Sequence, residues 1–135
     1  MYSHILIPVL LNGRTDVKHA KSVAETLLAK GGKITVLHVV ETIPPYLERH
    51  LTPAIHVETQ TWAKKKLAEV AAEMGVNDTV LLDGPPGRNI VNWAQENSAD
   101  CIVIDSHQPA FSDLFLGSVA AWVVRHATTS VHVLR

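Results

Sequence analysis

The sequence predicts an α/β domain with a five-stranded, mostly parallel sheet, strand order 3-2-1-4-5, and helices on both faces. Short apolar segments rich in β-branched residues alternate with segments whose apolar residues recur every three or four positions. Strands that alternate with helices are joined by right-handed crossovers, which make the sheet parallel and cover both its faces. The length of 135 residues, 47% of them hydrophobic, suits one core, so residues 1–135 are expected to form a single domain.

The individual elements follow from apolar runs and from turn residues. The expected strands are residues 4–11, 33–40, 79–82, 101–104 and 130–134. The expected helices run from a cap at Thr15 to Gly31-Gly32, over residues 57–74, after the turn at 83–87, and from Gly117-Ser118. Pro8 predicts a bulge or an end in the first strand, because proline cannot donate to a strand ladder. Residues 41–56 contain three prolines and are expected to form a loop.

Composition excludes several classes of protein. The formal net charge of -1 gives no basic stripe for DNA or RNA, so no nucleic-acid partner is expected. Cys101 is the only cysteine and lies in an apolar run, which excludes an intramolecular disulfide and predicts an inert, buried thiol. Residues 1–10 lack the basic start of a signal peptide, and no apolar stretch reaches the roughly 20 residues that span a bilayer. A cytoplasmic protein without membrane contact is expected.

The most informative stretch is residues 101–127, where a strand leads through a polar loop into a helix. The free N–H groups and the dipole of a helix N-terminus favour an anion such as phosphate. In a sheet of order 3-2-1-4-5, ligands bind beyond the carboxyl ends of the first and fourth strands, where this loop lies. Ser118 is either a plain helix cap or a cap that also holds phosphate. Ser106 and His107 are either ordinary loop residues or ligand contacts, and their place after a strand favours ligand contacts.

Other chemistry finds little support in the sequence. Neither GxxxxGK[ST] nor GxGxxG occurs, which removes two common nucleotide-binding classes. The eight histidines form no HxxxH or HExxH pair, so no metal site is predicted, and His38 is interpreted as a hydrogen-bonded core residue. No GxSxG elbow and no locally fixed pair of carboxylates occurs, so no catalytic residue is predicted. An enzyme of nucleotidyl transfer or pyrophosphate hydrolysis rests on fold analogy alone.

Four segments of the chain resemble the universal stress protein family: HILIPV, TVLHVV, DGPPGRNIVNWA, and the final segment from DSHQP through LGSVAAWVVRHA to the C-terminus. The short SHQP loop ending in LGS looks most like the UspF and UspG subgroup. This resemblance implies an adenine nucleotide alpha hydrolase-like, Rossmann-like three-layer sandwich. Two positions depart from the family pattern, because Leu10 stands where an aspartate is usual and Asp105 where a glycine is usual.

The resemblance also implies a ligand and a set of contacts. The implied cofactor is ATP, with ADP and AMP as alternatives and Mg²⁺ accompanying the nucleotide. The implied binding residues are Pro8 and Val39 beside the adenine, Val9 and Leu10 next to Pro8, Asp105, Ser106, His107, Gln108, Pro109 and Ala110 around ribose and phosphates, and Gly117, Ser118, Val119 and Ala120 at the phosphates.

The expected function is therefore that of a universal stress protein, an ATP-binding regulatory homodimer, with slow ATP hydrolysis at most a secondary activity. Family members pair their last strands, which here means Ser130 to Leu134. The alternative, which Leu10 and Asp105 motivate, is a dimeric interaction protein of the same fold that binds no nucleotide. The sequence does not identify the protein partners or the stress that the protein serves.

Overall fold

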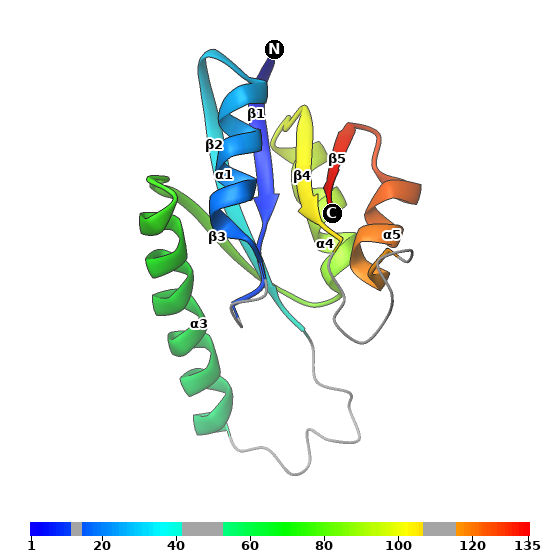
Figure 1. Ribbon diagram of the computed structural model, residues 1–135. Helices are drawn as coiled ribbons and strands as arrows, with labels where there is room; N and C mark the ends of the chain where they lie inside the picture. The colour runs from blue at the N-terminus through cyan, green and yellow to red at the C-terminus, as the bar shows by residue number, and fades with distance from the viewer. Residues whose placement is uncertain (12–14, 42–52, 107–115) are drawn as a thin grey trace.

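The computed structural model describes residues 1–11, 15–41, 53–106 and 116–135. Its elements, in chain order, are β1 (Tyr2–Pro8), α1 (Val17–Leu27), β2 (Leu28–Val40), α3 (Pro53–Glu73), β3 (Asp78–Asp83), α4 (Pro86–Glu96), β4 (Cys101–Asp105), α5 (Ser118–His126) and β5 (Ser130–Leu134) (Figure 1). The strands form one sheet of order β3-β2-β1-β4-β5. Every strand pair in this sheet is parallel, which confirms the predicted fold class.

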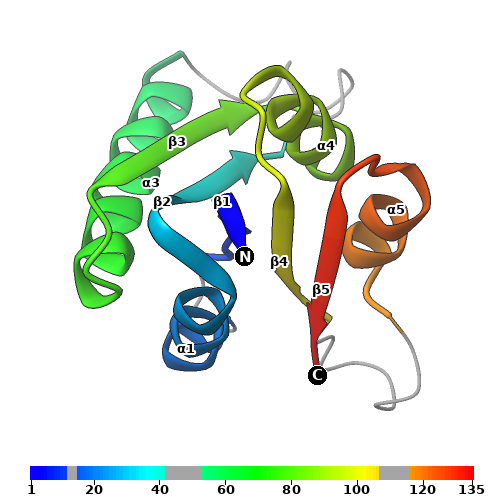
Figure 2. The same cartoon turned by 90° about the horizontal axis from the view of Figure 1, so that it is seen from above.

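The helices cover the sheet as two outer layers. α1 and α3 lie on one side, and α4 and α5 on the other (Figure 2). The central strand β1 supplies both cores, because successive side chains of a strand point to opposite faces. Ile5 and Ile7 pack in the core under α1 and α3, whereas Leu6 packs in the core under α4 and α5. All three side chains are almost fully buried.

The predicted inner faces of the crossover helices are confirmed. In α3 the buried residues include Ala63, Leu67, Val70 and Ala71, with Met74 directly after the helix, and in α4 they include Ile90, Val91 and Ala94. Spacings of three and four residues place these side chains on one stripe of each helix, where they meet the sheet. Pro8 predicted either a bulge or an end in the first strand, and the structure shows that β1 ends there. The next residue still bonds to β2, because the Val9 N–H donates to the Leu37 carbonyl at 2.8 Å.

Both predicted ends of the first helix are wrong. Asp16, not Thr15, is the N-cap of α1, and its carboxylate accepts a hydrogen bond from the His19 N–H at 3.0 Å. The helix ends at Leu27, and β2 begins at the next residue. Gly31 and Gly32 lie inside β2, where the pairing with β1 shifts register. A Cβ on Gly32 would lie 3.0 Å from the Ser3 carbonyl oxygen, so Gly32 serves a close strand contact and not a helix end.

The proline-bearing loop predicted at 41–56 is shorter than expected. α3 begins at Pro53, because proline is compatible with the first turn of a helix, and residues 42–52 lie outside the described part of the chain. No helix in the described ranges is long and apolar enough to span a membrane.

Candidate functional site

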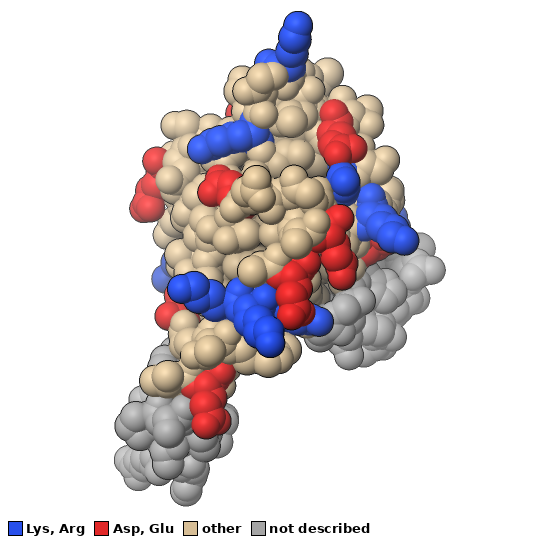
Figure 3. Space-filling model, turned by 90° about the vertical axis from the view of Figure 1, so that its left-hand side faces the viewer, with Lys and Arg blue, Asp and Glu red and all other residues tan. Residues whose placement is uncertain are grey.

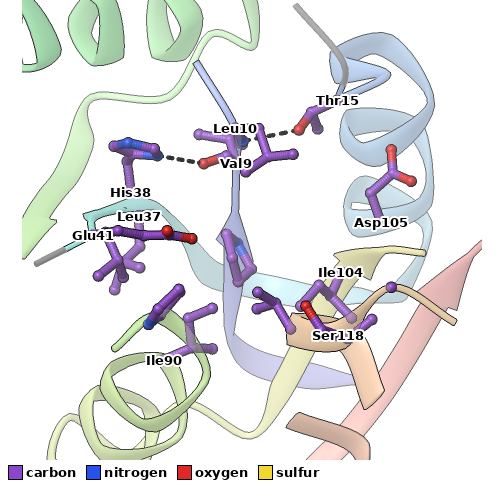
Figure 4. A pocket seen from close by; sticks show the side chains of 16 residues that line it. Val9, Leu10, Thr15, Leu37, His38, Glu41, Ile90, Ile104, Asp105 and Ser118 are labelled. Carbon is purple, nitrogen blue, oxygen red and sulfur yellow. Dashed lines mark hydrogen bonds between the residues drawn. The ribbon is translucent and has the colours of Figure 1, made fainter. Parts of the chain in front are cut away.

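A cavity of about 220 Å³ opens at the carboxyl ends of the central strands (Figure 4). It lies where the strand order reverses, between β1 and β4, as the topology predicts for an open parallel sheet. The sequence-predicted residues that line it are Pro8, Val9, Leu10, Val39, Asp105, Gly117, Ser118, Val119 and Ala120. The fold thus brings together residues from four elements and from the segment that follows β1.

The floor of the cavity is apolar. Val39 of β2, Ile90 of α4 and Ile104 of β4 all line it, and each is at least 93% buried. These side chains belong to the core between the sheet and the helices α4 and α5, so core packing fixes their positions. A floor of this kind favours a flat, weakly polar ring over a charged group.

Two hydrogen bonds hold the chain where it leaves β1. The Leu10 N–H donates to the Thr15 hydroxyl at 2.9 Å, and the His38 Nδ1–H donates to the Val9 carbonyl at 2.7 Å (Figure 4). Thr15, predicted as a helix cap, therefore fixes the cavity rim. The Leu10 side chain, at the position where the family usually has aspartate, is 47% exposed.

The N-terminus of α5 supplies the polar end of the cavity. Gly117, and not Ser118 as predicted, is the N-cap, with extended backbone. Ser118 is the first helical residue, and its side chain is exposed. The first helical hydrogen bond runs from the Ala121 N–H to the Gly117 carbonyl at 2.9 Å, so the N–H groups of the three preceding residues have no partner within the helix. Such groups are available to an anion. The Gly117 N–H itself already donates to the Ser106 carbonyl at 3.3 Å.

The charged side chains that line the cavity are acidic. They are Glu41 after β2 and Asp105 at the end of β4, and no lysine or arginine is among the described lining residues. The Asp105 carboxylate lies toward α1 (Figure 4), where it accepts a hydrogen bond from the Asp16 N–H at 3.4 Å. Asp105 therefore interacts with the N-terminus of α1.

Ser106 does not line the cavity, although its carbonyl accepts the hydrogen bond from Gly117. It is buried, and both its N–H and its hydroxyl donate to the Leu134 carbonyl, at 2.9 and 2.6 Å. Its hydroxyl thus ties β4 to β5 and is not among the groups that line the cavity. The remaining predicted contacts, His107, Gln108, Pro109 and Ala110, lie outside the described residues.

Sequence reasoning missed several residues that line the cavity: Thr15, Leu37, His38, Glu41, Pro86, Ile90 and Ile104. His38 makes the hydrogen bond expected of a core histidine, yet it is only partly buried and reaches the cavity. One signal could have found His38 and Glu41, because both lie near the carboxyl end of β2, the edge where ligands bind. Pro86 and Ile90 have no such signal, since the packing of α4 decides which of its residues face the cavity.

Two further groups bear on chemistry elsewhere in the molecule. Burial, with Asp100 nearby, raises the pKa of the Cys101 thiol to about 11, so the thiol is protonated at neutral pH, as predicted for an inert cysteine. Within the described ranges, no three His, Cys, Asp or Glu side chains lie together as metal ligands would.

On the side of α3, charges of both signs are interspersed (Figure 3). The ion pairs within helices include Lys21 with Glu25 at 3.8 Å and Lys66 with Glu69 at 3.7 Å. Such exposed pairs contribute little to stability. The view shows no broad field of positive charge of the kind that would attract nucleic acid.

The parallel sheet of order 3-2-1-4-5 and the cavity at its switch point define an α/β protein of the adenine nucleotide alpha hydrolase-like fold. The chain belongs to the universal stress protein family, whose model matches residues 1–135. A universal stress protein of Thermus aquaticus is 32% identical over 139 residues and is covered, like this chain, over its full length. Universal stress protein G of Salmonella typhimurium is 30% identical over 142 residues, again with full coverage of both chains.

Solved structures agree with this assignment at the level of the fold. The universal stress protein UspA from Lactobacillus plantarum superposes with a TM-score of 0.73 at 24% identity, over 99% of this chain and 98% of that one. A universal stress protein in complex with cAMP gives a TM-score of 0.64 at 18% identity, with coverage of 99% and 97%. A universal stress protein from Archaeoglobus fulgidus in complex with dAMP gives a TM-score of 0.61 at 21% identity, over 99% of this chain and 98% of that one.

Proposed function

We propose that this universal stress protein binds an adenine nucleotide in the cavity between β1 and β4 and acts as a regulatory, stress-response protein in the cytoplasm. The observation that carries the proposal is one cavity with an apolar floor at one end and the unbonded first turn of a helix at the other. The apolar floor suits an adenine ring, and the free N–H groups of the helix suit a phosphate. The complexes of two structural neighbours with cAMP and dAMP support the same class of ligand.

The expected orientation follows from the chemistry of the lining. The adenine ring would lie beside Pro8 and Val39. The phosphates would accept hydrogen bonds from the Ser118 hydroxyl and from the N–H groups of Ser118, Val119 and Ala120. The N–H group of Gly117 would contribute less, because it already donates to Ser106. The ribose would lie near Asp105, which the α1 N-terminus already neutralises in part.

The charge of the cavity favours a ligand with few phosphates or with a bound cation. Glu41 and Asp105 repel a triphosphate, and like charges at about 4 Å cost on the order of 4 kcal/mol at the effective dielectric constant of a protein surface. Mg²⁺ would neutralise part of that charge. We therefore expect AMP and ADP to bind at least as well as ATP without Mg²⁺, and ATP to gain most from added Mg²⁺.

Two variants of Ser118 test the phosphate end, with titration calorimetry of AMP, ADP and ATP as the measurement. Ser118→Ala removes only the hydroxyl and should weaken binding roughly 2- to 10-fold, the effect of one hydrogen bond. Ser118→Pro also removes the N–H and should weaken binding roughly 10-fold or more, because hydrogen bonds to a charged group are stronger. α5 should tolerate this proline, since Ser118 is the first helical residue and Gly117 before it is extended, with ψ 155.

Ser22→Ala is the matched control, because Ser22 is exposed on α1 and does not line the cavity. It should bind nucleotide like the unmodified protein. Nucleotide binding that neither Ser118 variant weakens would contradict the assignment of the phosphate end.

The second candidate is a dimeric interaction protein that binds no nucleotide. The two carboxylates in the cavity and the apolar Leu10 favour it, because both features oppose a phosphorylated sugar. Thermal unfolding separates the two candidates, since a ligand that binds only the folded state raises Tm. No rise in Tm with any of the three nucleotides, with or without Mg²⁺, would favour this candidate over the first.

In both candidates we propose a homodimer that pairs the β5 strands of two chains. β5 is an edge strand, and within the described residues it pairs with β4 alone. An unpaired strand edge invites pairing with another chain, and a specific dimer satisfies it. No catalytic residue is proposed, and slow ATP hydrolysis would be a secondary activity of the nucleotide complex.

A further inference from the structure

A chain of polar groups connects β1, β2 and β3 at the amino-terminal half of the sheet, away from the cavity. His4 Nδ1 lies 3.3 Å from the Asn97 carbonyl oxygen, and His4 Nε2 lies 2.8 Å from the Thr35 hydroxyl. The Thr35 hydroxyl in turn lies 2.5 Å from Asp78 Oδ2, on the first residue of β3. His4 and Thr35 are buried, whereas Asp78 is exposed.

These contacts need one more proton than the neutral groups supply. The Asn97 carbonyl and the Asp78 carboxylate only accept hydrogen bonds, so each of the three contacts requires its own proton. A neutral imidazole carries one N–H, and the threonine hydroxyl carries one O–H. All contacts are therefore satisfied together only when the His4 ring is protonated on both nitrogens.

When the His4 ring is neutral, one of the three contacts has no proton to form a hydrogen bond. The burial of the groups decides which contact this is. The Nδ1–H faces Asn97, so Nε2 is left as an acceptor inside the core, where an unsatisfied polar group is costly. The Asp78 carboxylate is exposed, and water can replace its hydrogen bond. The Thr35 hydroxyl then donates to His4 and no longer to Asp78.

We propose that the Thr35 hydroxyl is a proton-dependent switch, which donates to Asp78 when the His4 ring is charged and to His4 Nε2 when the ring is neutral. In the first state a continuous hydrogen-bonded chain links β1 through β2 to the edge strand β3. In the second state the link to β3 is broken. The switch thus makes one side-chain contact of an edge strand depend on the protonation of a histidine in the central strand, while the backbone pairing of β2 and β3 stays in place.

The surroundings of His4 set the pH at which the switch operates. Burial has the largest effect on the pKa of His4 and lowers it, and Lys33 of β2 lowers it further. The Asn97 carbonyl, Asp78 of β3 and Asp100 before β4 act in the opposite direction but are weaker. From α4, the uncharged Trp93 ring meets the imidazole edge-on at 5.7 Å. The pKa of His4 therefore lies below its ordinary value of 6.5, and the link to β3 forms only in acid solution.

Nuclear magnetic resonance tests the switch in the intact protein without any substitution. At neutral pH the ¹⁵N shifts of the His4 ring should report the tautomer with the proton on Nδ1. As the pH is lowered, the carboxyl ¹³C shift of Asp78 should show a second inflection at the pH where His4 titrates. An Nε2–H tautomer at neutral pH, or an Asp78 shift that does not follow His4, would overturn the proposal.

A pair of substitutions separates a hydrogen-bonded switch from the electric field of a nearby charge. Thr35→Val keeps the shape of the side chain and removes the hydroxyl, so the second Asp78 inflection should disappear. Thr35→Ser keeps the hydroxyl and is the matched control, in which the inflection should persist. An inflection of unchanged size in Thr35→Val would mean that only the charge of His4 acts on Asp78, and the switch would be rejected.

Discussion

Gly87 is a residue of α4 that lies close against α5. A Cβ on Gly87 would lie 3.0 Å from the Trp122 ring, closer than nonbonded carbon atoms normally come. The Trp122 ring is held in place by the His126 ring, stacked on it at 3.8 Å between centroids, and by the core under α4 and α5 against which it packs. The absence of a side chain at Gly87 therefore sets the distance between two helices that both line the cavity.

We predict that Gly87→Ala destabilises the protein by about 1–2 kcal/mol, since the overpacking cost of roughly 1–3 kcal/mol exceeds the gain of up to about 1 kcal/mol from alanine in a helix. The free energy of unfolding in urea measures the change. Asn92→Ala, on the exposed side of α4, is the control and should leave stability within about 0.5 kcal/mol. A more stable Gly87→Ala variant would show that the Trp122 ring yields.

At the scale of elements, the outer edge of β5 determines how two chains can meet. The Leu134 carbonyl accepts from the Ser106 N–H, so Leu134 directs its backbone groups toward β4. Backbone groups of successive strand residues point to opposite edges, which leaves those of Val131 and Val133 on the outer edge. A dimer that pairs β5 strands would use these two residues.

We predict that the N–H groups of Val131 and Val133 exchange with deuterium slowly at high protein concentration and faster on dilution, as the dimer dissociates. The N–H group of His132 faces β4 and is the internal control, with exchange that changes little on dilution. Light scattering over the same range should report a mass falling from 29.6 kDa, twice the 14.8 kDa of one chain. A chain that stays monomeric at every concentration would contradict pairing through β5.

The elements also show how far the sequence predicts this fold. Apolar periodicity predicted all five strands and the buried stripes of α3 and α4, because burial leaves its pattern directly in the sequence. The end of α1 was predicted wrongly, since Gly31-Gly32 has the local signature of a helix end while a contact with Ser3 decides its use.

The residues of the cavity also divide into those that the sequence predicts and those that depend on contacts between distant parts of the chain. The place of the cavity could be predicted because topology brings the carboxyl ends of the strands together, and the family resemblance implied Val39 and Asp105, which lie at those ends. The positions of Ser106 and Ile90 depend on which neighbour each side chain meets, the Leu134 carbonyl for one and the cavity floor for the other. No local pattern in the sequence carries that information.

At the scale of the whole molecule, His4 and Asp100 join the first strand to the turn between α4 and β4. Burial raises the pKa of Asp100, but hydrogen bonds from the N–H groups of Ser3 and His4, both at 2.9 Å, together with smaller effects, outweigh it. The pKa of Asp100 therefore lies below its ordinary value of 3.8, and that of His4 lies below 6.5. The two groups bind protons less readily in the folded chain than in the unfolded chain.

We predict that the free energy of unfolding falls in two stages on acidification. Below pH 6.5 the unfolded chain takes up a proton on His4 that the folded chain resists, so stability starts to fall there and stops falling once the pH is below the folded pKa. Near and below pH 3.8 the same argument applies to Asp100, whose ionised form accepts the Ser3 and His4 hydrogen bonds. Urea unfolding at a series of pH values measures both stages.

Asp100→Asn assigns the second stage, because asparagine does not titrate and can accept only one of the two backbone hydrogen bonds through its carbonyl oxygen. The variant should be less stable at neutral pH by about 1–3 kcal/mol, the cost of weakening charged hydrogen bonds, and its stability should fall less steeply below pH 3.8. The first stage should remain, since His4 is intact. A variant whose stability depends on pH as in the unmodified protein would show that other carboxylates cause the acid loss and that Asp100 does not anchor the first strand.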